Sequence, residues 1–94
     1  MHMSIRRIRL AIKDGSYAFS DHALEEMDDD GLLESDVREV MMQGKIVAKL
    51  TGDPRGIRFV VGGTTRDEET EVEVVCRFLP TGILRIITAY AVED

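Results

Sequence analysis

The chain has 94 residues, of which 44% are hydrophobic and 32% charged, and its formal net charge is −6. This composition is typical of one small folded domain and excludes a disordered tail, and no apolar run approaches the roughly 20 residues that a membrane-spanning helix needs. Because a nucleic-acid-binding domain normally carries a basic surface, the acidic balance restricts any such surface to a local patch.

The first helix is predicted from Ser4 to Asp14. Ser4 is a favourable N-cap residue, and Gly15, directly after the helix, is a typical C-terminal stop. Isoleucines at positions 5, 8 and 12 recur at helical spacing, so they predict one buried stripe.

The second helix is predicted to begin at Ser20 and to end at Gly31. Phe19, just before it, is placed to pack on Leu24 as a hydrophobic staple. Its predicted buried residues are Ala23, Leu24 and Met27.

Ser35 is predicted to cap a third helix, which ends at Gly44 and buries Val37, Val40 and Met41. Residues 21–43 carry nine acidic side chains against Arg38 alone. The second and third helices are therefore expected to form the acidic part of the molecule.

From Lys45 the hydrophobic period falls from about 3.6 to 2, which indicates strands. Four strands are predicted, over residues 46–50, 57–61, 70–79 and 83–92, with a turn at 51–56 and a polar loop at 62–69. The predicted fold is α+β: three N-terminal helices packed on one face of a four-stranded antiparallel sheet, forming a single domain over residues 1–94.

The last two strands are predicted to form a hairpin through a three-residue loop, Pro80-Thr81-Gly82. In that register Leu79 pairs with Ile83, Arg77 with Arg85, and Cys76 with Ile86. One face of the hairpin is then predicted to hold Val72, Val74, Cys76, Phe78, Leu84, Ile86, Thr88 and Tyr90.

The cysteine content and the N-terminal segment favour a cytoplasmic protein. Cys76 is the one cysteine, so it cannot form an intrachain disulfide, and burial in the core is the expected role of this thiol. Residues 5–10 alternate charged with apolar side chains and predict no signal peptide. Because so short a chain buries a limited fraction of its surface, we expect a homodimer or another partner to add support.

His22 is a candidate functional residue at the second position of its helix, where the helix dipole disfavours a protonated ring. A neutral imidazole there can act as a general base, or it can tether the helix start to a backbone carbonyl. Ser20, Asp21 and His22 cannot form a catalytic triad, because consecutive helical side chains point about 100° apart.

The acidic segment from Glu26 to Gly31 is spaced like the start of a calcium-binding loop, but the position that requires a bidentate Glu is Val37. We therefore expect no metal site. Asp28, Asp29 and Asp30 are interpreted as a solvated surface or as a docking surface for a basic partner.

Three arginines, Arg58, Arg77 and Arg85, are expected to project from the sheet. Arg77 and Arg85 are candidates for binding phosphate, because a guanidinium offers paired donors. Cross-strand ion pairs with Glu71 and Glu73 are the simpler interpretation.

The segment Asp53-Pro54-Arg55-Gly56 is first of all predicted to be a turn. If the segment also has a function, the turn would present Arg55 beside the sheet edge. Tyr90 lies near the end of the last strand, where a packing role is the default.

Three motifs, taken in order, resemble those of a small bacterial family of domains of unknown function. They are Ser20-x-His22-Ala23 with Met27, then Asp53-Pro54-Arg55-Gly56, and finally Ile86-Ile87-Thr88-x-Tyr90. Members of that family are often encoded beside a zinc-ribbon, helix-turn-helix protein similar to the MqsA/YgiT antitoxins. By neighbours and layout the family is similar to ribonuclease toxins of the RelE, BrnT and MqsR kinds.

The resemblance implies a toxin-like component of a bacterial toxin–antitoxin pair, acting as a metal-independent endoribonuclease on messenger RNA. His22 is then the candidate base, Arg55 or Arg58 the phosphate cation and Tyr90 the acid, with no cofactor. Many members carry arginine at the positions of Glu26 and Asp30. The alternative is a non-catalytic interaction domain whose acidic helices bind a basic, DNA-binding partner of the antitoxin type.

Overall fold

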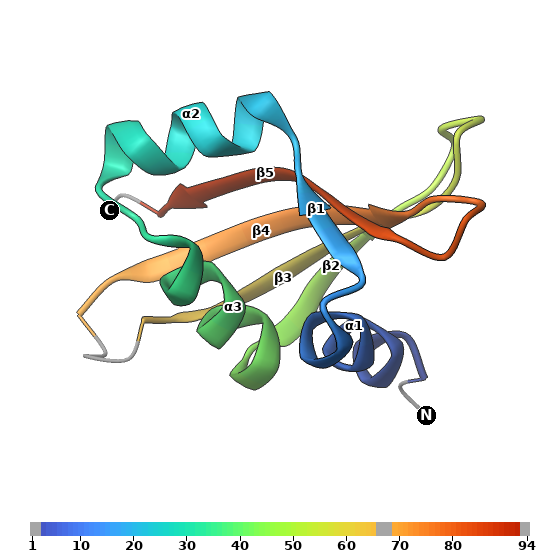
Figure 1. Ribbon diagram of the computed structural model, residues 1–94, viewed down its shortest axis with the longest axis horizontal. Coiled ribbons are helices and arrows are strands. Elements are labelled where there is room, and N and C mark those ends of the chain that lie inside the picture. Colours follow the sequence, from blue (N-terminus) through green and yellow to red (C-terminus); the bar gives the residue numbers. More distant parts are fainter. Residues whose placement is uncertain (1–2, 66–68, 93–94) are drawn as a thin grey trace.

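The computed structural model describes residues 3–65 and 69–92. In chain order the elements are α1 (Met3–Asp14), β1 (Tyr17–Phe19), α2 (Asp21–Asp30), α3 (Glu34–Gln43), β2 (Lys45–Leu50), β3 (Arg58–Thr64), β4 (Glu71–Phe78) and β5 (Leu84–Ala91) (Figure 1). The strands form one sheet in the order β1-β5-β4-β3-β2, in which β1 runs parallel to β5 and the other pairs are antiparallel. The α+β class and the three helices are confirmed. The prediction of a four-stranded, purely antiparallel sheet is wrong.

Strand β1 was not predicted from the sequence. In it, Tyr17 pairs with Leu84 of β5 and Phe19 pairs with Ile86. Three residues are too few to establish an alternating pattern, so no periodicity signals this strand. Tyr17 and Phe19 pack against the core and against each other, with ring centroids 5.9 Å apart in an edge-to-face arrangement.

The hydrophobic core lies between α1, α3 and one face of the sheet, while α2 lies along β5 (Figure 1). Fully buried side chains from both layers include Ile8, Val37, Val40 and Met41 of the helices and Val61, Val74, Cys76 and Ile86 of the strands. Within the residues that the structure describes, no helix is long and apolar enough to cross a membrane.

Two predicted details of α2 and α3 are wrong. Leu24 is 40% exposed instead of buried, because α2 turns only a narrow stripe, Ala23 and Met27, toward the sheet. Ser35 lies inside α3, which Leu33 precedes; the carboxylate of Asp36 accepts a hydrogen bond from the Leu33 N–H at 2.9 Å. A carboxylate three residues into the helix has replaced the expected serine cap. Similarly, α1 begins at Met3, so Ser4 lies within it.

Strand β3 extends to Thr64, through two glycines that the sequence placed in a loop. A Cβ on Gly63 would lie 3.1 Å from the Cα of Gly44, so the missing side chain lets the end of α3 approach the sheet closely. The rest of the predicted loop includes residues 66–68, which lie outside the described residues.

The β4–β5 hairpin follows the predicted register only up to a β-bulge. The predicted pairs of Arg77 with Arg85 and of Cys76 with Ile86 are confirmed, but the next pair joins Val75 to Thr88, which leaves Ile87 unpaired.

Beyond the bulge every side chain of β5 changes face. Ala89 becomes fully buried, whereas Tyr90 pairs with Glu73 on the opposite face. The prediction that Thr88 and Tyr90 share the apolar face is therefore wrong. The bulge is held by Ser20, whose N–H donates to the Ile86 carbonyl at 2.9 Å and whose hydroxyl donates to the Ile87 carbonyl at 2.8 Å.

Candidate functional site

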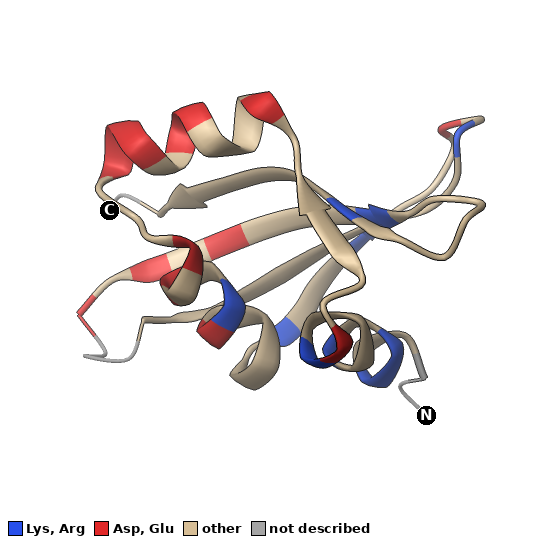
Figure 2. Ribbon diagram, viewed as in Figure 1, with Lys and Arg blue, Asp and Glu red and all other residues tan. Residues whose placement is uncertain are grey.

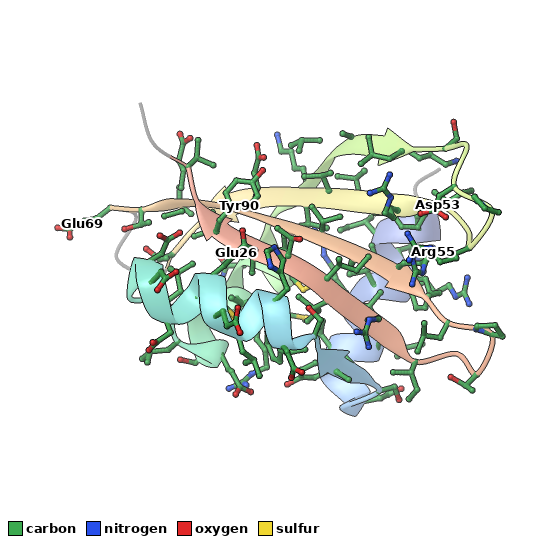
Figure 3. The ribbon with its side chains drawn as sticks, turned by 90° about the horizontal axis from the view of Figure 1, so that it is seen from above. Glu26, Asp53, Arg55, Glu69 and Tyr90 are labelled. Carbon is green, nitrogen blue, oxygen red and sulfur yellow. The ribbon has the colours of Figure 1, made fainter. Side chains whose placement is uncertain are left out.

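The bulge brings the start of α2 and the rim of the last two strands together at one corner of the sheet. We call the group of His22, Glu26, Glu73 and Tyr90 the Tyr90 corner. The Tyr90 hydroxyl donates to Oε1 of Glu73 at 2.6 Å, and His22 Nε2 lies 3.4 Å from Oε1 of Glu26. Glu26 and Tyr90 lie side by side in Figure 3, from α2 and β5 respectively. Two of the predicted site residues, His22 and Tyr90, thus reach the same corner.

Two acids of α2 bond to the backbone of β5. Because β1 pairs only with residues 84–86, no strand of the described residues neighbours the second half of β5 on that side. There Glu26 Oε1 accepts from the Ala89 N–H at 3.3 Å, and Asp30 Oδ2 accepts from the Ala91 N–H at 2.8 Å. Glu26 and Asp30 are the positions at which the family resemblance implied arginine. Here they are acceptors for an otherwise unpaired strand edge.

The Tyr90 corner carries negative charge. The hydrogen bond to Glu73, partial burial and the nearby charges of Glu73 and Glu26 all raise the pKa of Tyr90. The phenol therefore stays protonated at neutral pH and donates to Glu73. His22 is 64% exposed and is N2 of α2, as predicted, since Ser20 is the N-cap. With two carboxylates in the group, this corner suits a cation better than a phosphate.

The Asp53-Pro54-Arg55-Gly56 segment is a turn whose charges satisfy each other. The Asp53 carboxylate accepts from the backbone N–H and guanidinium of Arg55 at 2.9, 3.2 and 3.1 Å, and lies 3.8 Å from Nε of Arg58. These contacts, above all the Arg55 side-chain hydrogen bonds, lower the pKa of Asp53 to about 2. Gly56 closes the turn at φ +121°, which a residue with a side chain adopts only with strain.

The candidate phosphate-binding arginines lie at the other end of the sheet from the Tyr90 corner. Arg77 and Arg85 are paired on β4 and β5, and Arg58 lies beside them on β3. Four residues of β4, about 13 Å of strand, separate Arg77 from Glu73. Figure 3 shows Asp53 and Arg55 at this distant end. The structure therefore does not bring Arg55 or Arg58 to His22 and Tyr90.

The comparison with protein families covers most of the chain. Residues 19–91 match a family model described as "Domain of unknown function (DUF4258)". The chain belongs to the DUF4258 family. Searches of curated proteins and of solved structures found no match. The DUF4258 span begins at Phe19 and ends at Ala91, so it includes the Ser20 cap, the bulge and the Tyr90 corner and leaves α1 outside.

Within the DUF4258 span, the acids of α2 divide into two sets. Glu26 and Asp30 accept hydrogen bonds from the β5 backbone, although Asp30 is exposed; Asp21, Glu25, Asp28 and Asp29 form an exposed second set. Figure 2 shows α2 as the most continuous acidic segment in the view, and α2 contains no Lys or Arg. Of the three predicted partner-binding residues, Asp28 and Asp29 are therefore available, and Asp30 has a structural bond.

Cys76 is fully buried in the core of the DUF4258 domain, as predicted, and desolvation raises the pKa of its thiol to about 12. It is not a nucleophile in the native fold.

The site residues that the sequence analysis did not predict are Glu26 and Glu73. The sequence shows that Glu26 and Asp30 are four residues apart on a helix. It does not show that both carboxylates accept hydrogen bonds from the β5 backbone beyond the bulge.

Proposed function

We propose that this DUF4258 domain is a protein-interaction module, the toxin-like member of a toxin–antitoxin pair, which binds a basic DNA-binding partner through α2. The observation that carries the proposal is the division of the α2 acids. Glu26 and Asp30 bond to β5, while four further carboxylates are exposed on a 10-residue helix that carries no Lys or Arg.

Electrostatics explain why this surface favours a basic partner. Like charges crowded on one helix repel one another, and a cationic partner converts that repulsion into attraction. A surface of one sign also steers an oppositely charged protein into the correct encounter and raises its association rate.

The test is the association rate with the product of the adjacent reading frame, measured by stopped flow at low and high salt. Asp28→Asn/Asp29→Asn should slow association at least about threefold at low salt and flatten the salt dependence. The matched control is Asp14→Asn/Glu71→Gln, which changes net charge equally but away from α2. Equal rates for both double variants would rule out α2 as the docking surface.

A second candidate function is a metal-independent endoribonuclease acting on messenger RNA. It is favoured by the meeting of His22 and Tyr90 at one corner. In such a reaction a neutral imidazole takes the 2′-hydroxyl proton, the oxygen attacks the phosphorus, and an acid protonates the departing 5′-oxygen. The cations at Arg58, Arg77 and Arg85 would have to bind neighbouring phosphates, since they lie at the far end of the strands.

Induced expression in a bacterial host tests this second candidate. An active ribonuclease should arrest growth and cleave messenger RNA, and His22→Ala or Tyr90→Phe should relieve both effects while the domain stays folded. Normal growth and intact RNA in cells that contain soluble, folded protein would exclude the enzyme and leave the interaction module standing.

A further inference from the structure

The sheet has one face that no described helix covers, here called the open face. Strand pairing places on it Lys45, Ala48 and Leu50 of β2, Arg58, Val60, Gly62 and Thr64 of β3, Glu71, Glu73, Val75 and Arg77 of β4, and Arg85, Thr88 and Tyr90 of β5. The opposite face carries the core residues on which α1 and α3 pack. The open face is therefore available to a partner.

On β3, β4 and β5, the charges of the open face are sorted by their position along the strands. Arg58, Arg77 and Arg85 form a row at one end, and Glu71 and Glu73 lie at the other end with Tyr90. Lys45, on the outer strand β2, is paired with Gly62 at the acidic end. Figure 2 shows basic and acidic residues at opposite ends of β4. On β4 itself, Val75 is the midpoint between Glu73 and Arg77, so the face carries an apolar centre between two opposite charges.

Within the cationic row and among the described residues, Arg58 alone lies near a carboxylate, with its Nε 3.8 Å from Asp53. Arg77 and Arg85 are directly opposite each other, an arrangement that costs free energy for like charges. Across residues 3–65 and 69–92, no carboxylate lies within ion-pair distance of either guanidinium. The expected partner, Glu73, bonds to Tyr90 instead. An external carboxylate would relieve this repulsion.

The shape of the open face is also suited to receive an arginine side chain of a second copy. Val47 and Leu50 are 57% and 37% exposed beside it. The absent side chain of Gly62 contributes to a hollow of about 250 Å³, whose lining includes Val47, Glu71 and Glu73. Such a hollow, apolar on one wall and anionic on another, fits the stem and head of an arginine.

We propose that the open face is a homodimer interface, with a two-fold axis that lies in the interface plane and crosses the strands at the level of Val75. This rotation sets Arg77 of one copy against Glu73 of the other, and symmetry repeats the contact. It also brings Arg58 of the second copy over the hollow beside Gly62. A two-fold axis along the strands would set arginine against arginine, and like-charge repulsion excludes it.

The size of the face sets the expected affinity. Four strands about 4.8 Å apart and about seven residues long give roughly 450 Å² per copy, below the roughly 800 Å² of a standard stable interface. We therefore expect a weak, reversible dimer. Nucleic acid is a poorer occupant, because Glu71 and Glu73 on the same face repel its backbone.

Charge exchange between copies tests the interface. In sedimentation velocity up to about 500 µM, Arg77→Glu and Glu73→Arg should each be monomeric, because self-pairing then joins like charges. An equimolar mixture of the two variants should recover the dimer, since both contacts in the mixed pair join opposite charges. Arg6→Glu reverses a charge on α1, away from the open face, and should dimerise like the wild type.

Two results would overturn the proposal: a monomeric wild type at the highest concentration, or two variants with native circular dichroism that form no mixed dimer. A further readout identifies the other occupant. If the wild type is monomeric and binds polyuridylate, and Arg77→Glu alone abolishes that binding, the open face belongs to nucleic acid and the dimer is excluded.

Discussion

Ser20 joins three elements through one small side chain. Its hydroxyl accepts the Ala23 N–H at the start of α2 and donates to the Ile87 carbonyl at the bulge of β5, while its own N–H continues the pairing begun by β1. The residue is 6% exposed, so water cannot replace these bonds. The bulge and the helix start are thus fixed together.

Ser20→Ala should lower the free energy of unfolding by about 2–3 kcal/mol, because it removes an N-cap and leaves a carbonyl without its donor. The matched control is Ser35→Ala, at an exposed serine that caps nothing, and it should change stability by less than about 0.5 kcal/mol. Urea denaturation of both variants measures the difference. Equal effects would show that the Ser20 bonds contribute nothing beyond helix propensity.

Asp53 makes the turn before β3 sensitive to acid. Its pKa is lowered from 3.8 to about 2, so its contribution to stability is complete above the unfolded value and is lost as pH falls from about 4 toward 2. The denaturation midpoints of the wild type and Asp53→Asn should therefore differ at pH 5 and converge near pH 2. In Arg55→Gln, a carboxyl-carbon titration by NMR should show the pKa of Asp53 rising toward 3.8. A midpoint difference that persists at pH 2 would contradict the ionic origin.

At the scale of elements, α2 replaces a strand at the edge of β5. Residues four apart in a helix are separated by about 6 Å along its axis, and N–H groups two apart in a strand by about 6.8 Å. Glu26 and Asp30 thus meet the N–H groups of Ala89 and Ala91 in step. The helix protects an edge that would otherwise invite pairing with another chain.

Hydrogen exchange measures this protection residue by residue. Glu26→Ala should raise the exchange rate of the Ala89 amide at least about tenfold, and Asp30→Ala should do the same for Ala91, since each loses a charge-assisted acceptor. Glu25→Ala, at an exposed acid of the same helix, should leave both rates unchanged. If the two amides exchange at wild-type rates in all three variants, packing of α2 and not its carboxylates protects the edge.

The elements also show how far the sequence predicts this fold. The three helices and the hairpin carry enough periodic residues to be recognised, and the hairpin register is correct through Cys76. Beyond Cys76, the extra residue Ile87 moves each following side chain of β5 to the other face of the sheet. The local sequence does not predict this bulge, because the side chain that bonds to it, Ser20, lies 67 positions earlier. Strand β1 was missed since its partner, too, is distant in sequence.

At the scale of the molecule, the same limit applies to the site. Sequence reasoning named His22 and Tyr90, and the fold brings them together; it also named Arg55 and Arg58, which the fold places at the other end of the strands. The type of a residue shows which chemistry its side chain can perform. Its place on the sheet, however, depends on the register in which the strands pair. The separation of basic from acidic residues along β4 and β5 therefore depends on the three-dimensional structure.

Cys76 reports the integrity of the whole core. Because its side chain is fully buried and its pKa is raised to about 12, iodoacetamide should alkylate it only when the domain opens. The alkylation rate should rise with urea in parallel with global unfolding followed by circular dichroism. Rapid alkylation in native buffer, at the rate of the urea-unfolded chain, would show that the core opens locally around β4.

The parallel contact between β1 and β5 has a consequence for synthesis. Ser20 and its neighbours emerge early from the ribosome, yet the carbonyls that complete the start of α2 belong to residues 86 and 87. The nascent chain can form helices as it grows, but it cannot close its sheet until nearly all of β5 has been made. During that interval the edge of β4 lacks its strand neighbour, which makes this a period when a chaperone would find an unpaired strand to bind.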